Sequence, residues 1–176
     1  PRPGPWPDAL RYADEWLRKN WADPDAHLRY CNVILQAEQA GWPIDSASTV
    51  QPGMAVEYRE KGESQVHSFI IEEGEQELLS DELSPTNVRA QRVLGKGPGE
   101  TFSLSTAGIQ ERTAEVVAIL SKYVYRLQDC MNQFQVRFPE REDLQQVRLA
   151  RQNAAGEGEL DLSPILASLD QRRQQV

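Results

Sequence analysis

The pattern of hydrophobic and polar residues predicts helices at both ends of the chain and strands in its middle. A first helix is expected over residues 8–20, with an apolar face formed by Leu10, Ala13, Trp16 and Leu17. Asp23 is a typical N-cap and Pro24 a typical first helical residue, so a second helix is expected to run from there to Ala40. Residues 1–49 are therefore predicted to hold a helical hairpin after a proline-rich lead-in at residues 1–7.

Between residues 50 and 121 the pattern changes to short runs that are typical of strands. Strands are expected at 54–58, 66–71, 101–104 and 113–120, and the second of these is apolar on both faces at its far end, which favours a central position. Ser84 and Pro85 predict a capped helix between the second and third strands. That helix is expected to end at Gly95, where a left-handed residue is needed, before a glycine-rich turn.

The last third of the chain is predicted to be helical again. An amphipathic stripe ends at Pro139 and consists of Tyr123, Leu127, Cys130, Met131, Phe134 and Phe138. Further helices are expected at 141–153 and after Ser163. The predicted fold class is α+β, with a small antiparallel sheet and one capped helix, flanked by the N-terminal hairpin and by C-terminal helices. The expected domains are 1–49, 50–121 and 122–176.

The charge of the chain limits the classes of partner. The 176 residues carry a net charge of −8, and residues 50–90 hold nine acids against three bases. An acidic surface repels phosphate, so binding of duplex DNA by this region is not expected. A basic protein partner would suit it, and a solvated acidic face is the alternative. No apolar run approaches the length of a membrane span and no signal peptide is expected, which favours a cytoplasmic location.

The sequence predicts neither an active site nor a metal site. Neither His27 nor His67 has a cysteine or a carboxylate at the spacing of a metal ligand, so no metal or other cofactor is expected. Cys31 and Cys130 lie in apolar helical stripes and are predicted to be buried hydrophobic residues, with a disulfide left open. The glycines of 95–99 follow a helix instead of opening one, which favours a turn over a phosphate-binding loop. An enzyme is not expected.

The order of elements around the capped helix resembles the C-terminal domain of the GreA/GreB transcript-cleavage factors. The matching motifs are Ser84-Pro85, Ala90, Leu94-Gly95-Lys96 and Gly99-Glu100, although the helix looks about one turn, or ~3.6 residues, longer than in those factors. The resemblance implies an FKBP-like fold that docks on RNA polymerase, without the coiled-coil tip that carries the family's metal-assisting acids. The residues it implies for partner binding are Asn87, Arg89, Arg92, Lys96 and Glu100.

The N-terminal hairpin resembles a junction between tetratricopeptide repeats. The combination is similar to bacterial proteins that join such helices and a GreA/GreB-like module to a PIN-type nuclease domain. Since the first residue is Pro1 and not Met, a fragment or a processed chain is expected.

The function expected from the sequence is a non-catalytic protein-binding module that docks on RNA polymerase in transcription elongation. The alternative is a structural scaffold or homo-oligomerisation domain that buries Tyr123, Phe134 and Phe138 between chains. A third hypothesis, prolyl isomerase activity, has only Tyr58, Phe69 and Phe102 to line a pocket.

Overall fold

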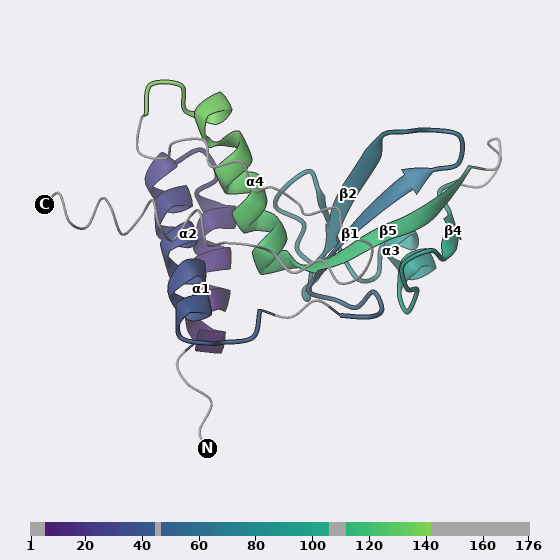
Figure 1. Ribbon diagram of the computed structural model, residues 1–176, viewed down its shortest axis with the longest axis horizontal. Coiled ribbons are helices and arrows are strands. Elements are labelled where there is room, and N and C mark those ends of the chain that lie inside the picture. Colours follow the sequence, from purple (N-terminus) through teal and green to yellow (C-terminus); the bar gives the residue numbers. More distant parts are fainter. Residues whose placement is uncertain (1–5, 45–46, 106–111, 142–176) are drawn as a thin grey trace, which may run out of the picture. The chain divides into compact units, whose positions relative to one another are not determined.

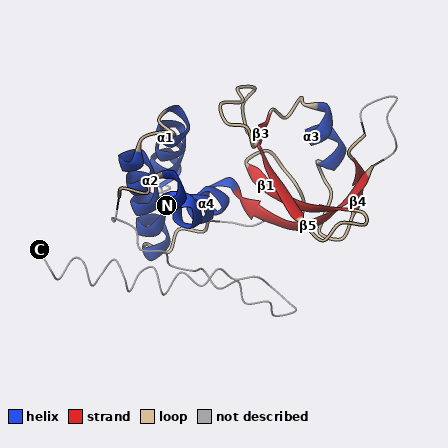
Figure 2. Cartoon of the chain, turned by 90° about the horizontal axis from the view of Figure 1, so that it is seen from above, coloured by secondary structure: helices blue, strands red, loops and turns tan. Residues whose placement is uncertain are grey.

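The computed structural model describes residues 6–44, 47–105 and 112–141, which form an α+β fold (Figure 1). Figure 2 distinguishes its helices, strands and loops by colour. In chain order they are α1 (Trp6–Lys19), α2 (Pro24–Gln39), β1 (Met54–Glu60), β2 (Val66–Ile71), β3 (Glu82–Leu83), α3 (Val88–Val93), β4 (Thr101–Ser103), β5 (Thr113–Ser121) and α4 (Lys122–Arg137). The helices predicted at 141–153 and after Ser163 lie outside the described residues, apart from Arg141.

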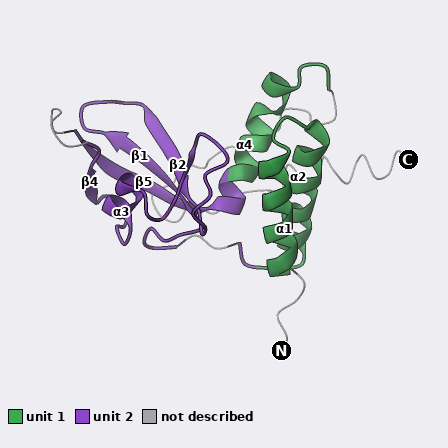
Figure 3. Cartoon of the chain, turned by 180° about the vertical axis from the view of Figure 1, so that it is seen from behind, with its two compact units in different colours: residues 1–42, 126–176 green, residues 43–125 purple. Residues whose placement is uncertain are grey.

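The chain divides into two compact units (Figure 3). Unit 1 contains the described parts of residues 1–42 and 126–176, and unit 2 contains those of residues 43–125. The division passes through α4, whose first turn follows β5 without a break. Within the described ranges, no helix combines the length and the apolar character that crossing a membrane requires.

The five strands of unit 2 form one mixed sheet in the order β3-β2-β1-β5-β4. β1 pairs antiparallel with β2 and β5, and β5 pairs antiparallel with β4. The expected sheet was entirely antiparallel, but the short strand β3 pairs parallel with β2. β1 therefore occupies the centre. β2 has neighbours on both sides only at Ile70 and Ile71, and these two residues are fully buried.

The helix of unit 2 is shorter than predicted, and its predicted cap at Ser84 is wrong. Asn87 is the N-cap, because its side-chain oxygen accepts a hydrogen bond from the backbone N–H of Arg89 at 2.9 Å. Ser84 instead belongs to a turn before the helix, where its carbonyl accepts from the N–H of Asn87 at 2.9 Å. Gly95 has φ +81°, which confirms the left-handed residue predicted after the helix.

The core of unit 2 lies between α3 and one face of the sheet. Figure 2 shows α3 beside the strands, and its buried residues Ala90 and Val93 belong to the same hydrophobic cluster as the strand residues. The other buried members of the cluster are Val50, Val56, Tyr58, Phe69, Ile71, Phe102, Ala114, Val116 and Ile119. Burial of this many apolar side chains is the main stabilising contribution available to a unit of this size.

Unit 1 is helical, and its first loop has the predicted cap. The side chain of Asp23 accepts a hydrogen bond from the N–H of Asp25 at 2.9 Å, and α2 starts at Pro24, as expected. α1 starts at Trp6, so the predicted extended lead-in is wrong at residues 6 and 7. Proline is tolerated in the first turn of a helix, where its missing N–H would have no intrahelical partner.

The buried face of α1 differs from the predicted one by an exchange of two residues. Leu10, Ala13 and Leu17 are buried as expected, but Trp16 is 39% exposed. Asp14 takes a place in the buried face and is 1% exposed. A buried carboxylate without a partner destabilises a fold, so Asp14 needs a cationic or hydrogen-bonding partner within unit 1.

Both cysteines are buried in unit 1 and neither forms a disulfide, which confirms the prediction of small buried residues. Cys130 Sγ lies 3.2 Å from Nδ1 of His27, whose Nε2 donates to the carbonyl of Trp21 at 2.8 Å. A hydrogen bond with Cys31, and then burial, raise the pKa of the Cys130 thiol well above its ordinary value. The thiolate that reacts with electrophiles is therefore disfavoured.

We expect both thiols to be unreactive toward a disulfide reagent in the native protein and reactive once it is unfolded in denaturant. Reaction needs an opening of unit 1, so protection of at least about a hundredfold is expected for a domain of ordinary stability. Single Cys31→Ser and Cys130→Ser variants assign each thiol in a colorimetric assay. A thiol that reacts at the denatured rate in the native protein would contradict this arrangement.

Candidate functional site

The five residues predicted to bind a partner lie in one segment of unit 2, from the cap of α3 to the start of β4. The turn in this segment is shaped by two glycines with positive φ, Gly95 at +81° and Gly99 at +85°. Glu100 closes it, because its carboxylate accepts a hydrogen bond from the N–H of Gly97 at 2.6 Å. The backbone of Glu100 also accepts from the N–H of Val116 at 2.9 Å, which attaches the turn to β5.

Arg89 points into its own unit instead of presenting a cation to a partner. Its guanidinium donates a hydrogen bond to the hydroxyl of Tyr58. The same group lies 4.8 Å from the ring centre of Tyr58 and 4.9 Å from that of Phe69, which is the distance of a cation–π interaction. Arg89 therefore packs α3 against the sheet.

Arg92 and Asn87 are also used within unit 2. The guanidinium of Arg92 donates to the carbonyl of Ser103, at 3.3 Å, and to the carbonyl of Ser105, so it joins α3 to the end of β4. The side-chain oxygen of Asn87 caps α3. Charge-assisted and capping hydrogen bonds of this kind position the backbone and leave fewer donors for another protein.

Lys96 differs from the other four residues. Its backbone is fixed, because its carbonyl accepts from the N–H of Val50 at 2.8 Å and its N–H donates to Val93 at 3.1 Å. In the described parts of the chain, no hydrogen bond or ion pair involves its ammonium group, and the residue is half-buried. Of the predicted partner-binding residues, Lys96 is thus the one whose polar side-chain group makes no hydrogen bond or ion pair with the described residues.

The acidic segment that precedes α3 is not one solvated face. Glu72 and Glu82 are buried, and the carboxylate of Glu82 accepts from the N–H of Leu78 at 2.7 Å. Glu57 is buried as well, whereas Glu73 and Glu75 are exposed. Since several of these carboxylates serve the fold, the predicted choice between a partner surface and a solvated face applies only to the exposed ones.

The aromatic residues that an isomerase pocket would need are brought together but belong to the core. The ring centre of Tyr58 lies 5.6 Å from that of Phe69 and 5.7 Å from that of Phe102. All three side chains are buried, so they present no apolar surface to a proline ring. Of the interface residues of the scaffold hypothesis, Phe134 is fully buried in unit 1, and the ring centre of Phe138 lies 5.1 Å from that of Phe134. Tyr123 is half-buried.

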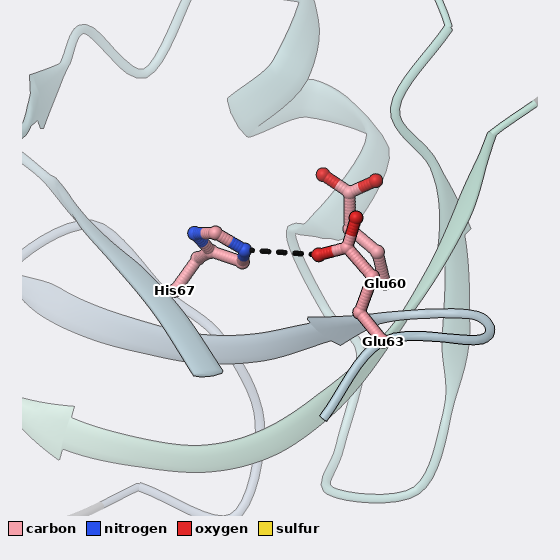
Figure 4. A group of neighbouring side chains, drawn as sticks. All are labelled: Glu60, Glu63 and His67. Atoms are coloured by element: carbon pink, nitrogen blue, oxygen red, sulfur yellow. Dashed lines mark hydrogen bonds and ion pairs between the residues drawn. The ribbon is translucent and has the colours of Figure 1, made fainter. Parts of the chain in front are cut away.

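The sequence analysis did not anticipate one group of side chains at the β1–β2 hairpin. Glu60, Glu63 and His67 each offer a ligand atom, and these atoms lie within 4.8 Å of one another (Figure 4). Arg112 holds Glu60, with its Nε 2.9 Å from Oε2 of the carboxylate. The sequence contained a usable signal, because the polar stretch 60–63 lies between two predicted strands, and a turn there brings the ends of those strands together.

Comparison with known proteins gives no match to a protein-family model and none to a curated protein. Among solved structures, the prokaryotic transcription elongation factor GreA/GreB from Nitrosomonas europaea is similar, with 16% identity, a TM-score of 0.38 and coverage of 64% of this chain and 93% of that chain. The transcription factor Gfh1 is similar with 17% identity, a TM-score of 0.37 and coverage of 65% and 83%. Both TM-scores are low, so the site is interpreted from its own residues.

Proposed function

We propose that this chain is a non-catalytic protein-binding module that docks on RNA polymerase, with Lys96 as the principal contact residue. The observation that carries the proposal is the state of the Lys96 ammonium, for which the described residues provide no hydrogen bond or ion pair. Arg89 and Arg92, by contrast, are engaged inside unit 2. A lysine held in this way can pair with a carboxylate of another protein without first breaking an internal ion pair.

The turn that carries Lys96 supports the proposal through its rigidity. The positive φ of Gly95 and Gly99, together with the hydrogen bond from Gly97 to Glu100, restricts the backbone on both sides of the lysine. Binding by a preorganised segment loses less conformational entropy than binding by a flexible one. The motifs Leu94-Gly95-Lys96 and Gly99-Glu100 are also those in which the sequence resembles the docking domain of the GreA/GreB factors.

The wider setting is part of the same proposal. Unit 2 acts as an FKBP-like docking module, and α1 and α2 act as a tetratricopeptide-like pair. Both belong to a larger cytoplasmic protein in which a PIN-type nuclease domain supplies the catalytic activity.

The Lys96→Glu variant is expected to bind purified bacterial RNA polymerase at least about tenfold more weakly than the wild type, because the reversed charge then faces a carboxylate. Biolayer interferometry with the immobilised full chain measures the change. Lys61→Glu is the matched control, since Lys61 is an exposed lysine on the β1–β2 turn of the same unit and undergoes the same change of charge. Equal affinities of the wild type and Lys96→Glu, or no saturable binding by the wild type, would refute the docking proposal.

A further inference from the structure

We infer that Glu60, Glu63 and His67 bind a divalent transition-metal ion, with Zn²⁺ as the best chemical match. The inference rests on the geometry of the β1–β2 hairpin and does not depend on docking to a polymerase. Nε2 of His67 lies 3.3 Å from Oε2 of Glu63, and one carboxylate oxygen of Glu60 completes a set within 4.8 Å (Figure 4).

The backbone of the hairpin fixes where the three residues start. The N–H of Glu63 donates to the carbonyl of Glu60 at 3.0 Å, and Gly62 between them has φ +93°, as the third residue of a type II turn requires. His67 is paired directly with Tyr58 across the two strands. The imidazole stacks on the Tyr58 ring with centres 5.5 Å apart, so the ring is held on the same face as the turn carboxylates.

The spacing of the donor atoms suits one small cation. Bonds of about 2.0–2.2 Å from zinc to nitrogen and oxygen place neighbouring donors of a tetrahedral site about 3.4 Å apart. The distance between His67 and Glu63 already has this value, at 3.3 Å. Arg112 holds Glu60, so Glu63 and His67 have to approach it, by at most about an ångström and a half. Small changes of their partly exposed side chains supply this movement.

The charges of the site favour a cation although an arginine is present. Arg112 binds Oε2 of Glu60 and leaves Oε1 available, so the arginine orients the ligand in the way that outer-shell partners of metal sites do. With a neutral imidazole, the charges of Glu60, Glu63 and Arg112 add up to −1. The side chain of Glu60 is largely shielded from water, which strengthens its attraction for a cation compared with a fully solvated carboxylate.

The donor set selects the metal. An imidazole with two carboxylates suits Zn²⁺ and its first-row neighbours, whereas Ca²⁺ and Mg²⁺ prefer sets made of oxygen alone. Three protein ligands leave a fourth position of a tetrahedral ion for water. The hairpin is therefore matched to a Zn²⁺ ion with one exchangeable position.

The test is a calorimetric titration of the metal-free full chain with Zn²⁺. We expect one equivalent to bind, and we expect His67→Gln and Glu63→Gln each to weaken binding by at least about tenfold, because each removes a ligand. The matched control is Glu75→Gln, which removes the charge of an exposed glutamate in the loop after β2 and should leave the affinity unchanged. Mg²⁺ in the same buffer is expected not to compete.

Two results would overturn the inference. One is the absence of saturable Zn²⁺ binding by the wild type. The other is an unchanged affinity in both ligand variants, which would place the metal elsewhere, for instance on the thiols of Cys31 and Cys130. Shifts of the His67 imidazole nitrogen resonances on addition of Zn²⁺ provide a readout on the wild type alone, so the outcome does not depend on how well a variant folds.

Discussion

Replacing Asp14 by alanine is expected to destabilise unit 1 by about 3–5 kcal/mol, because the variant leaves a buried guanidinium without this carboxylate. Oδ1 of Asp14 lies 2.8 Å from Nε of Arg126, and the two side chains are only 2% and 1% exposed. Removing one partner from a buried ion pair costs the desolvation of the charge that stays behind. A loss of this size is a large fraction of the 5–15 kcal/mol that typically holds a domain together.

Among the described neighbours of the pair, Tyr30 is not an anion that could replace Asp14. Tyr30 is fully buried in the same unit, and burial, followed by the charge of Asp14, raises the pKa of its hydroxyl well above the ordinary value. The tyrosine is therefore protonated and neutral at physiological pH. Asp14→Asn keeps the shape of the side chain while removing its charge, so comparing it with Asp14→Ala separates the electrostatic loss from the loss of packing.

Tryptophan fluorescence during urea unfolding is the appropriate measurement. The four tryptophans of the chain are Trp6, Trp16, Trp21 and Trp42, and all of them belong to unit 1. The matched control is Asp8→Ala on the same helix, because Asp8 pairs with Arg11 at 2.9 Å with both side chains largely exposed. No measurable change is expected there. Equal losses in Asp14→Ala and Asp8→Ala would show that the buried pair has no special role.

A double replacement tests the explanation further. In Asp14→Leu combined with Arg126→Met, both charges are removed together and apolar groups fill their places. Exchange of a buried ion pair for apolar residues of similar volume is often neutral or stabilising. We therefore expect the double variant to recover most of the stability lost in Asp14→Ala.

The elements whose signals are local could be predicted from the sequence. Asp23 is the N-cap of α2 and Pro24 is its first residue, as predicted, and the cap has the expected hydrogen bond. The strand predicted at 66–71 coincides with β2, and Gly95 has the predicted left-handed conformation. Each of these features depends on the conformational preferences of neighbouring residues, which the sequence displays directly.

Features that depend on pairing between distant residues could not be predicted in the same way. β3 has two residues, too few to show alternation, and it exists because Glu82 and Leu83 pair with the end of β2. The same pairing explains the misplaced cap. Ser84 directly follows β3, and its N–H donates to the carboxylate of Glu77 at 2.7 Å. Its backbone therefore belongs to the end of the edge strand and not to the start of the helix. Asn87, a cap residue of equal preference, takes the role.

The contacts of the candidate sites also depend on residues that are distant in the sequence, so they could not be predicted either. Arg89 has the sequence context of an exposed helical residue, but its hydrogen-bond partner Tyr58 lies 31 positions away. The ligand group of Glu60, Glu63 and His67 requires the register of the β1–β2 hairpin, which composition and spacing alone do not define. Periodicity could have placed Asp14 on the buried face, between Leu10 and Leu17, yet its partner Arg126 comes from a helix at the other end of the chain.

Glu72 and Glu73 provide a test of whether burial or distance determines the strength of an ion pair. Nζ of Lys122 lies 3.1 Å from a carboxylate oxygen of Glu72 and 3.2 Å from one of Glu73. The distances are nearly equal, but the side chain of Glu72 is 2% exposed and that of Glu73 is 62% exposed. Lys122 is itself buried, and its N–H donates to the carbonyl of Gly53 at 3.0 Å beside the start of β1.

Glu72→Ala is expected to destabilise unit 2 by about 3–5 kcal/mol, since the buried ammonium of Lys122 then loses its shielded partner. Glu73→Ala is expected to cost at most about 1 kcal/mol, because water screens that contact and replaces it when it is lost. Unit 2 holds no tryptophan, so hydrogen exchange of the β1 and β5 amides is the suitable measurement. Similar losses in the two variants would mean that distance, and not burial, controls the interaction. Burial of Lys122 would then add nothing to the strength of its ion pairs.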